Sequence, residues 1–187
     1  MPVRRSLETP RLLLRRFGPE DLAPFAALNA DPEVMAYFPS TLSRRESDEA
    51  VARIESGFSV HGFGLWALEV KATGAFIGFT GLAVPGFDAP FTPAVEVGWR
   101  LARSAWGSGF ATEAARVSLR HGFEELGLAE VVSFTFEGNR RSRAVMERLG
   151  MVRDRSGDFE HPRLVGHPLA PHVLYRLAAE SWFAAGA

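Results

Sequence analysis

A strand, a glycine loop and a helix follow one another in the middle of this chain, between Glu96 and Glu113. Apolar and polar side chains alternate over 95–101, which is the period of a strand. Gly107 and Gly109 follow, and a helical pattern of apolar residues begins directly after them. A glycine turn at a helix N-terminus presents unpaired N–H groups and the positive end of the helix dipole, which hold phosphate. The stretch therefore predicts a phosphate cradle, with a plain tight turn as the alternative.

The strand that leads into this loop carries a carboxylate beside a gap. Period two places Glu96, Gly98 and Arg100 on one face, opposite Val97 and Trp99. Because Gly98 has no side chain, a ligand is able to approach the backbone next to Glu96. Glu96 is a candidate general base if burial raises its pKa toward neutrality, and otherwise a solvated glutamate on a half-exposed strand.

Several classes of site are excluded or disfavoured by what the chain lacks. With no cysteine among 187 residues, disulfides, thiolate metal sites and a cysteine nucleophile are excluded. The nucleotide-binding motif Gly-x-x-x-x-Gly-Lys-Ser/Thr is absent, and Thr112 stands where a dinucleotide fingerprint needs its third glycine. His161, His167 and His172 do not have the spacing of a helical metal pair, so we expect no metal.

The overall charge and the N-terminal segment set further expectations. A net charge of −1 gives no electrostatic reason to expect nucleic acid or an anionic membrane as partner. The N-terminal segment lacks the apolar run of a secretory signal, and no window approaches the ~18 apolar residues of a membrane span. We therefore expect a cytoplasmic protein.

The pattern along the chain predicts one α/β or α+β domain over 1–187. A capping box from Ser43 to Glu46 begins a helix, Asp21 is the expected cap of an earlier one, and 71–74 is the expected turn of a hairpin. The predicted strands cover 11–17, 63–70, 76–83, 95–101, 131–136, 152–155 and 173–177, and the predicted helices begin at 22, 44, 111 and 139.

Four segments, in this order and spacing, resemble GNAT-type acyl-CoA N-acyltransferases. They are the strand with Glu96, the glycine loop, the segment Asn139-x-x-Ser142-x-x-Val-Met-Glu-Arg-Leu-Gly-Met, and the opening Thr9-Pro-Arg-Leu-Leu-Leu-Arg-Arg. The opening is similar to the branch that includes ribosomal-protein N-terminal acetyltransferases. The resemblance runs from about residue 9 to the strand that contains Tyr175 and implies a GNAT fold, with a mixed central sheet that splays near Gly98 and is flanked by helices.

The resemblance implies acetyl-CoA as co-substrate. The family's loop pattern is Gln/Arg-x-x-Gly-x-Gly/Ala, which Gly107 and Gly109 match, whereas Ser104 stands where Gln or Arg is usual. Asn139 is the expected partner of the pantetheine arm, with helix capping as its alternative. Arg140, Arg141 and Arg143 are either a solvated helix face or contacts of the CoA phosphates. The residues expected at the acetyl-CoA site are Trp99, Arg100, Leu101, Ser104, Trp106, Gly107, Ser108, Gly109, Phe110, Ala111, Thr112, Asn139, Ser142 and Met146.

The same resemblance assigns catalytic roles. Glu96 is the expected base, and Ser142 is expected near the cofactor sulfur as a candidate acid. Many GNAT enzymes carry an acidic tyrosine where this chain has Met146, which leaves Ser142, water or no acid. With no cysteine and no Gly-x-Ser-x-Gly elbow, we expect direct transfer without a covalent acyl-enzyme.

The expected activity is therefore transfer of an acetyl group from acetyl-CoA to a primary amine, on a protein N-terminus or a small molecule. The alternatives are a non-catalytic acyl-CoA-binding or sensor protein and, more remotely, a dinucleotide- or nucleotide-binding enzyme. Acceptor specificity is expected in the loops 31–45, 84–93 and 156–171. The sequence leaves the oligomeric state open, a dimer included.

Overall fold

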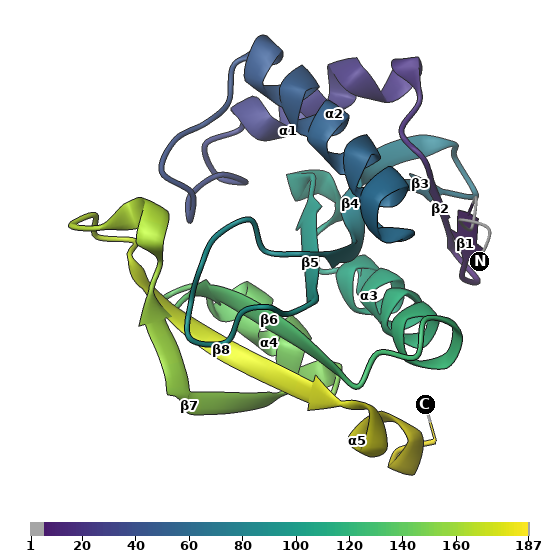
Figure 1. The fold of residues 1–187 in the computed structure, drawn as a ribbon. Coiled ribbons are helices and arrows are strands. Elements are labelled where there is room, and N and C mark those ends of the chain that lie inside the picture. The colour runs from purple at the N-terminus through teal and green to yellow at the C-terminus, as the bar shows by residue number, and fades with distance from the viewer. Residues whose placement is uncertain (1–5, 187) are drawn as a thin grey trace.

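The computed structural model describes residues 6–186, in which one mixed sheet of eight strands forms the centre (Figure 1). The spatial order of the strands is β1-β2-β3-β4-β5-β6-β8-β7. All neighbouring pairs are antiparallel except β5 and β6, which run parallel. The strands are β1 (Ser6–Glu8), β2 (Leu12–Arg15), β3 (Leu65–Val70), β4 (Ala75–Ala83), β5 (Glu96–Leu101), β6 (Glu130–Phe136), β7 (Val152–Glu160) and β8 (Pro171–Ala178).

The sheet opens at the single parallel junction. β5 and β6 pair only at Glu96 and Val132, where the Val132 N–H donates to the Val95 carbonyl at 2.9 Å. One step further the Ser133 hydroxyl donates to the Val97 carbonyl, also at 2.9 Å. Beyond this point the two strands diverge, as the ribbon in Figure 1 shows. The mixed sheet that splays near Gly98 is therefore confirmed.

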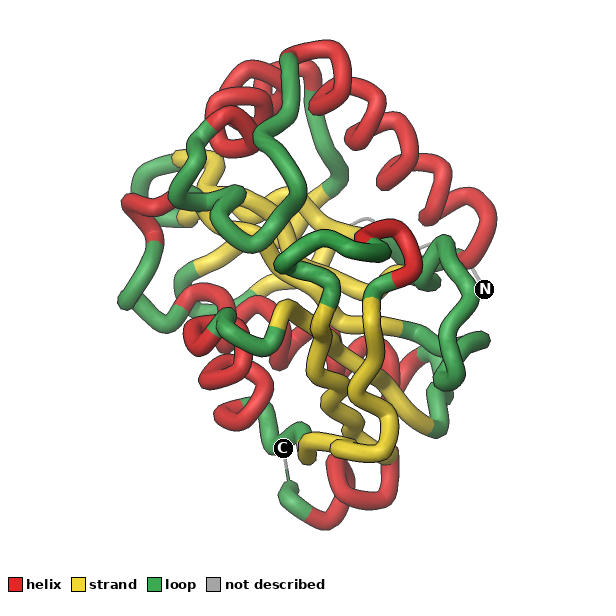
Figure 2. The backbone as a smooth tube through the Cα atoms, turned by 90° about the vertical axis from the view of Figure 1, so that its left-hand side faces the viewer, coloured by secondary structure: helices red, strands yellow, loops and turns green. Residues whose placement is uncertain are grey.

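Helices lie on both sides of the strand layer (Figure 2). α1 and α2 pack on one face around Phe25 and Phe79, while α3 packs on the other through Leu119 against Val97. Phe79 and Val97 face opposite sides because Phe79 is paired with Arg100 and alternation separates Arg100 from Val97. The helices are α1 (Leu22–Ala30), α2 (Arg44–His61), α3 (Phe110–Arg120), α4 (Arg140–Arg148) and α5 (Ala179–Ala184).

The capping box predicted at Ser43 is confirmed, but Asp21 does not cap a helix with its side chain. The Ser43 hydroxyl accepts from the Glu46 N–H, and the Glu46 carboxylate accepts from the Ser43 N–H. The buried carboxylate of Asp21 instead accepts from the Gly18 N–H at 2.8 Å and pairs with Arg15 at 2.5 Å. An unpaired buried carboxylate costs more free energy than an uncapped helix N-terminus, so the Asp21 side chain pairs with Arg15 instead of capping α1.

Three other elements differ from the sequence prediction. The helix predicted to begin at 111, α3, ends at Arg120 and continues as a π-helical turn, His121–Glu125, which the helical pattern did not predict. β7 extends to Glu160 rather than 155, with an irregularity in its pairing with β8 between Asp154 and Phe159. The short β1 and α5 were not predicted. β1 has only three residues, which is too few for a pattern, and α5 is stabilised by a tertiary contact of Trp182 with Phe123.

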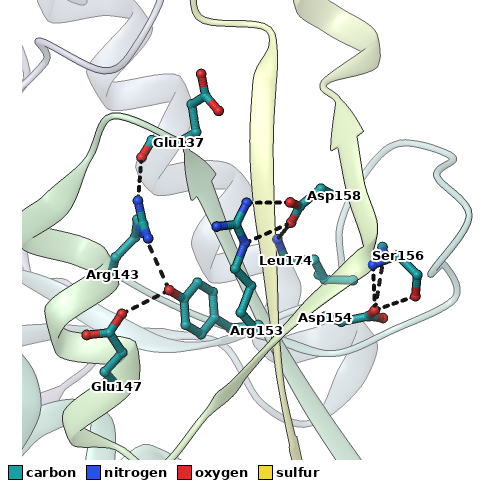
Figure 3. Close-up of polar contacts among 10 residues, drawn as sticks. Glu137, Arg143, Glu147, Arg153, Asp154, Ser156, Asp158 and Leu174 are labelled. Carbon is teal, nitrogen blue, oxygen red and sulfur yellow. Dashed lines mark hydrogen bonds and ion pairs between the residues drawn. The ribbon is translucent and has the colours of Figure 1, made fainter.

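The outer strands β7 and β8 form a polar network away from the splay (Figure 3). Arg153 and Asp158 form an ion pair within β7 at 2.5 Å. Tyr175 of β8 is buried, and its hydroxyl donates to Glu147 of α4 at 3.0 Å. Tyr175 is therefore a core aromatic of the strand. Among the described residues, no helix is both long and apolar enough to cross a membrane.

Candidate functional site

A cleft of about 1380 Å³ enters the molecule where β5 and β6 separate. Its walls come from β5, the loop before α3, the first turns of α3 and α4, and the segment 33–38 after α1. The opening of the sheet and the start of two helices thus meet in one cavity, which is large enough for an extended ligand.

The predicted glycine loop forms one wall of this cleft. Gly107 and Gly109 both have positive φ, +76° and +80°, a conformation that side chains rarely adopt. Gly109 is the N-cap of α3 and no side chain caps the helix, so the N–H groups of 110–112 have no partner within the helix. Three free N–H groups at the positive end of a helix are what a pyrophosphate requires, so the residues present fit the acetyl-CoA expected here.

The opening segment of the chain holds this loop in place. The Arg11 guanidinium donates to the Ser108 carbonyl at 3.0 Å and pairs with Glu113 of α3 at 2.5 Å. The Thr9 hydroxyl donates to the same carboxylate at 2.5 Å. Burial raises the pKa of Glu113, but the hydrogen bonds from Thr9 and Arg11 outweigh that effect and lower it below its ordinary value. The Thr-Pro-Arg segment is therefore a tether for the glycine loop, a role that the sequence analysis did not assign to it.

The edge of β5 that β6 leaves behind carries free backbone groups. The carbonyls of Val95 and Val97 point toward β6, and alternation gives Trp99 the same direction. No residue of β6 pairs with Trp99, so its N–H and carbonyl face the gap. Two residues on, the Leu101 carbonyl accepts from the Trp106 indole at 2.9 Å, which ends the free edge. An extended ligand arm is able to pair with this edge as a strand would.

Glu96 lies where the two strands part and lines the cleft. Burial raises its pKa to about 7, and no nearby cation opposes that shift. A carboxylate with a pKa near neutrality is half ionised at physiological pH and is poised to accept a proton.

Arg100 lies on the same face of β5 as Glu96, but its side chain turns toward α1 and away from the glycine loop. One guanidinium nitrogen donates to the Asn29 amide oxygen at 2.6 Å, and the Asn29 amide donates in turn to Ser47. The Phe38 ring lies 4.1 Å from the guanidinium carbon. Arg100 was expected among the cofactor residues. Its side chain lies on the α1 side of the same cleft, and its contact with the cofactor stays a prediction.

Asn139 and Ser142 meet at the start of α4. The side-chain amide oxygen of Asn139 accepts from the Ser142 N–H at 3.2 Å, and its side-chain NH2 donates to the Ser142 hydroxyl at 3.0 Å and to the Thr135 hydroxyl at 2.9 Å. The capping alternative for Asn139 is therefore realised, while the Ser142 hydroxyl keeps its proton for another acceptor. Met146, four residues further on, is fully buried in the core and brings no proton to the cleft.

Arginines surround the cleft near the helix starts. Arg141 lies over the Trp106 ring at 4.0 Å, and Arg140 lines the cleft beside it. Arg143 points away and donates to Tyr175 and to the Glu137 carbonyl (Figure 3). The predicted basic cluster thus divides, with two members at the cleft and one on the polar network of the outer strands.

The cleft brings together most of the residues predicted for the site. Ser104 and Ser108 are the exceptions: both are exposed and outside its lining. The loops 84–93 and 156–171 are also outside the lining, because their aromatic side chains, Phe87, Phe91 and Phe159, pack on Phe134 instead. Of the three predicted acceptor loops, 31–45 alone borders the described cleft.

The roles of some residues of the site were not indicated by the sequence. Asn29 lies in a helix pattern without a motif, and Thr9 and Arg11 are far from Glu113 along the chain. Only the polar character of Asn29 on an otherwise apolar helix face was available as a signal. Among the described residues, no three His, Asp or Glu side chains are grouped as a metal site requires.

Comparison with known proteins assigns the chain to a family of acetyltransferases. The acetyltransferase (GNAT) domain matches residues 11–152. An uncharacterized Bacillus subtilis protein, YkkB, is 34% identical over 152 residues, covering 81% of this chain and 87% of its own. An Aspergillus fumigatus FsC-acetyl coenzyme A-N(2)-transacetylase is 40% identical over 155 residues, covering 79% of this chain and 65% of its own.

Solved structures agree on the fold. An acetyltransferase of Agrobacterium tumefaciens superposes with a TM-score of 0.76 at 26% identity, over 93% of this chain and 94% of that chain. A ribosomal-protein-S5-alanine acetyltransferase of Vibrio fischeri has the same fold, with a TM-score of 0.74 at 16% identity over 96% and 99% of the two chains. This chain belongs to the GNAT family of N-acetyltransferases, whose co-substrate is acetyl-CoA.

Proposed function

We propose that this protein transfers the acetyl group of acetyl-CoA directly to a primary amine, with Glu96 as the general base. The observation that carries the proposal is the place of Glu96: a carboxylate with a pKa raised to about 7, at the point where the sheet opens. Acetyl-CoA supplies an activated thioester. The chain's own part is to hold it, to orient the amine and to move protons.

The glycine loop and the free edge of β5 support the binding step. The N–H groups of 110–112 would hold the pyrophosphate, and the free N–H and carbonyl of Trp99 would pair with the pantetheine arm. Arg141 and Arg140 add positive charge beside them. Ser104 takes no part in this arrangement, because the cradle consists of backbone groups.

The proton balance explains why a base is needed. An α-amine titrates near ~8 and a lysine amine near ~10.4, so the acceptor arrives mostly as an ammonium ion. Glu96 takes one proton from it, directly or through a water. The neutral nitrogen then attacks the thioester carbonyl carbon, and the carbon–sulfur bond breaks. The acetylated nitrogen releases its second proton to water or to the leaving sulfur. The sulfur otherwise leaves as thiolate or takes a proton from water or from Ser142, which solvent then reprotonates.

Ser142 is proposed for that last proton because its hydroxyl accepts from Asn139 and is free to donate. A CoA thiol titrates near ~8.5, as a free cysteine does, so the thiolate is a tolerable leaving group. Removal of the Ser142 hydroxyl is therefore expected to matter less than removal of the Glu96 charge.

The acceptor is a protein N-terminus or a small-molecule amine. The segment 33–38 borders the cleft on the side of Glu96 and Arg100, which supports an acceptor site on the α1 side of β5. The alternative of a non-catalytic acyl-CoA-binding protein has the missing tyrosine and the missing loop Gln or Arg in its favour.

The decisive experiment measures amine-dependent release of CoA for the parent and for Glu96→Gln between pH 6 and 9. A general base contributes about 10²–10⁴-fold, so kcat/KM is expected to fall by that factor in the variant while the acetyl-CoA Kd stays nearly unchanged. Equal rates across the pH range would remove Glu96 from the mechanism. Tight acetyl-CoA binding without turnover of any amine would favour the non-catalytic alternative.

A further inference from the structure

Arg100 is a cation in the cleft that has no anion beside it among residues 6–186. Its side chain is partly buried on the α1 side of β5, and its Nε atom is enclosed without a hydrogen-bond partner in that part of the chain. Burial lowers the pKa of the guanidinium only to about 10, so it is charged at neutral pH. It is not a residue that the proposed acetyl transfer uses.

The neighbours of Arg100 are neutral. Asn29 offers an amide oxygen, and Phe38 and Phe79 offer ring faces at 4.1 and 5.5 Å from the guanidinium carbon. Within residues 6–186, no carboxylate lies within ion-pair distance of Arg100. Glu33, which also lines the cleft, is paired with Arg103.

A charge held in this way is unusual, since a buried cation is costly unless an anion or several hydrogen bonds compensate it. One neutral hydrogen bond does not compensate a guanidinium with five donors. The fold nevertheless holds the side chain in place through the Asn29–Ser47 hydrogen bond and the two aromatic rings. An anion that reached Arg100 from the cleft would supply the charged partner that these neutral groups do not.

We propose that the acceptor amine of this enzyme carries a carboxylate, which Arg100 binds while the amine lies near Glu96. The inference rests on the proposed function and specifies its substrate class. Arginine suits a carboxylate because the planar guanidinium offers two parallel donors to its two oxygens.

The strand sets how far apart the two groups of the acceptor are. Glu96 and Arg100 are four residues apart on one face of β5, so their Cα atoms are separated by about 13 Å. The side chains reduce this distance but do not bring the two charges into contact. The amine and the carboxylate of the acceptor are therefore joined by a chain of several atoms.

The test uses a series of ω-amino carboxylates of increasing chain length, each beside the matching ω-amino carboxamide. The amine and the chain are the same in each pair, so the ratio of the two kcat/KM values isolates the carboxylate. For the best chain length we expect a preference of about 10- to 100-fold for the carboxylate, in line with a charged hydrogen bond.

Two variants connect that preference to Arg100. Arg100→Gln is expected to reduce the ratio to near one, chiefly through the KM of the carboxylate, with an unchanged acetyl-CoA Kd. Asn29→Asp would supply an internal carboxylate to Arg100 in an isosteric side chain, with the Ser47 hydroxyl able to donate to it. This variant is also expected to lose the preference, and it keeps the fold even if Arg100→Gln does not. Arg45→Gln, on the exposed face of α2, is the matched control.

The outcomes separate the two proposals. A parent enzyme that acetylates amines with no preference for the carboxylate overturns this inference and leaves acetyl transfer intact. A preference that survives both variants also overturns it. An acetyl-CoA Kd that weakens in Arg100→Gln as much as the acceptor KM rises would place Arg100 with the cofactor instead. If the parent acetylates no amine, the proposed function itself fails.

Discussion

The two walls of the cleft are built in different ways. On the wall formed by the glycine loop and α3, where we propose that acetyl-CoA binds, the binding groups are backbone N–H groups at the start of α3, and the nearby charges of Arg11 and Glu113 neutralise each other. On the wall next to α1, where we propose that the acceptor binds, the groups are the side chains of Glu96 and Arg100, and neither has a charged partner among the described residues. The first wall is stabilised by its own contacts, whereas the charges on the second wall have no partner among the described residues and are available to a ligand.

From this contrast we expect the wall with the glycine loop to tolerate changes of side chain better than the wall with Glu96 and Arg100. A cradle of backbone N–H groups needs only the glycine conformations, so Ser104 in place of the usual Gln or Arg leaves it intact. The acceptor wall acts through individual side chains, so its specificity depends on their identity. The cofactor class is therefore common to the family, and the acceptor is a property of this chain.

The largest effect on stability is expected from Glu96→Gln. The folded pKa of Glu96 is raised from 4.5 to about 7, so the folded state retains a proton that the unfolded chain releases earlier. The free energy of unfolding of the parent therefore falls as pH rises from about 4.5 to about 7 and stays lower above that. At pH 8 the uncharged variant is expected to be more stable by about 2–3 kcal/mol, and at pH 5 nearly equal to the parent.

Urea unfolding at pH 5 and pH 8 checks this prediction. Asp88→Asn, at an exposed carboxylate, is the control and is expected to have the stability of the parent at both pH values. A stability gain in Glu96→Gln of the same size at both pH values would mean that Glu96 is not buried as a charge.

Gly109→Val addresses the opposite wall. A β-branched residue at φ +80° costs about 1–3 kcal/mol, and the loop would relax away from the conformation that directs the N–H groups into the cleft. We expect the acetyl-CoA Kd to rise about tenfold or more, measured by calorimetry, with the acceptor KM unchanged at saturating acetyl-CoA.

Gly127→Val is the matched control for this variant. Gly127 has φ +68° but lies outside the cleft, so the substitution is expected to lower the thermal midpoint without changing the Kd. Equal effects of the two variants on acetyl-CoA binding would show that the loop has no specific role.

Glu113→Gln tests whether the tether of the glycine loop contributes to binding. The variant keeps the size of the side chain and removes the charge that Arg11 and Thr9 contact. A partly exposed ion pair contributes about 1 kcal/mol, so the acetyl-CoA Kd is expected to rise a few-fold. Glu49→Gln, from an exposed pair on α2, is expected to leave the Kd unchanged. A Kd equal to that of the parent would mean that the loop holds its conformation without the tether.

The smallest effect is expected at Arg153, which belongs to neither wall. Its ion pair with Asp158 lies within β7, in the network of Figure 3. Arg153→Gln is expected to cost less than about 1 kcal/mol and to shift the thermal midpoint by at most a few degrees. The KM values for acetyl-CoA and the acceptor are expected to stay at the parent values, and a change in either would connect the outer strands to the cleft.

Local patterns predicted the elements that depend on neighbours in the chain. The alternation over 95–101 and the box from Ser43 to Glu46 correspond to β5 and to the start of α2. The tether of Glu113 by Thr9 and Arg11 was not predictable in this way, because it joins residues about a hundred positions apart. The loops 84–93 and 156–171 were assigned to the acceptor because their sequence patterns indicate irregular backbone. Such patterns do not indicate which residues the side chains of a loop pack on.

Residue order alone was sufficient for the family, for the glycine turn before α3 and for the place of Glu96 on β5, because each depends on spacing within one strand, turn or helix. The tertiary structure decided which side chains face the cleft and which charges lack partners. Arg100 illustrates the difference: its position on β5 follows from alternation, whereas its turn toward Asn29 and its lack of an anion depend on how α1 packs on the sheet. Burial and pairing of side chains are properties of the assembled fold, so the proposed acceptor site can be inferred only from the tertiary structure.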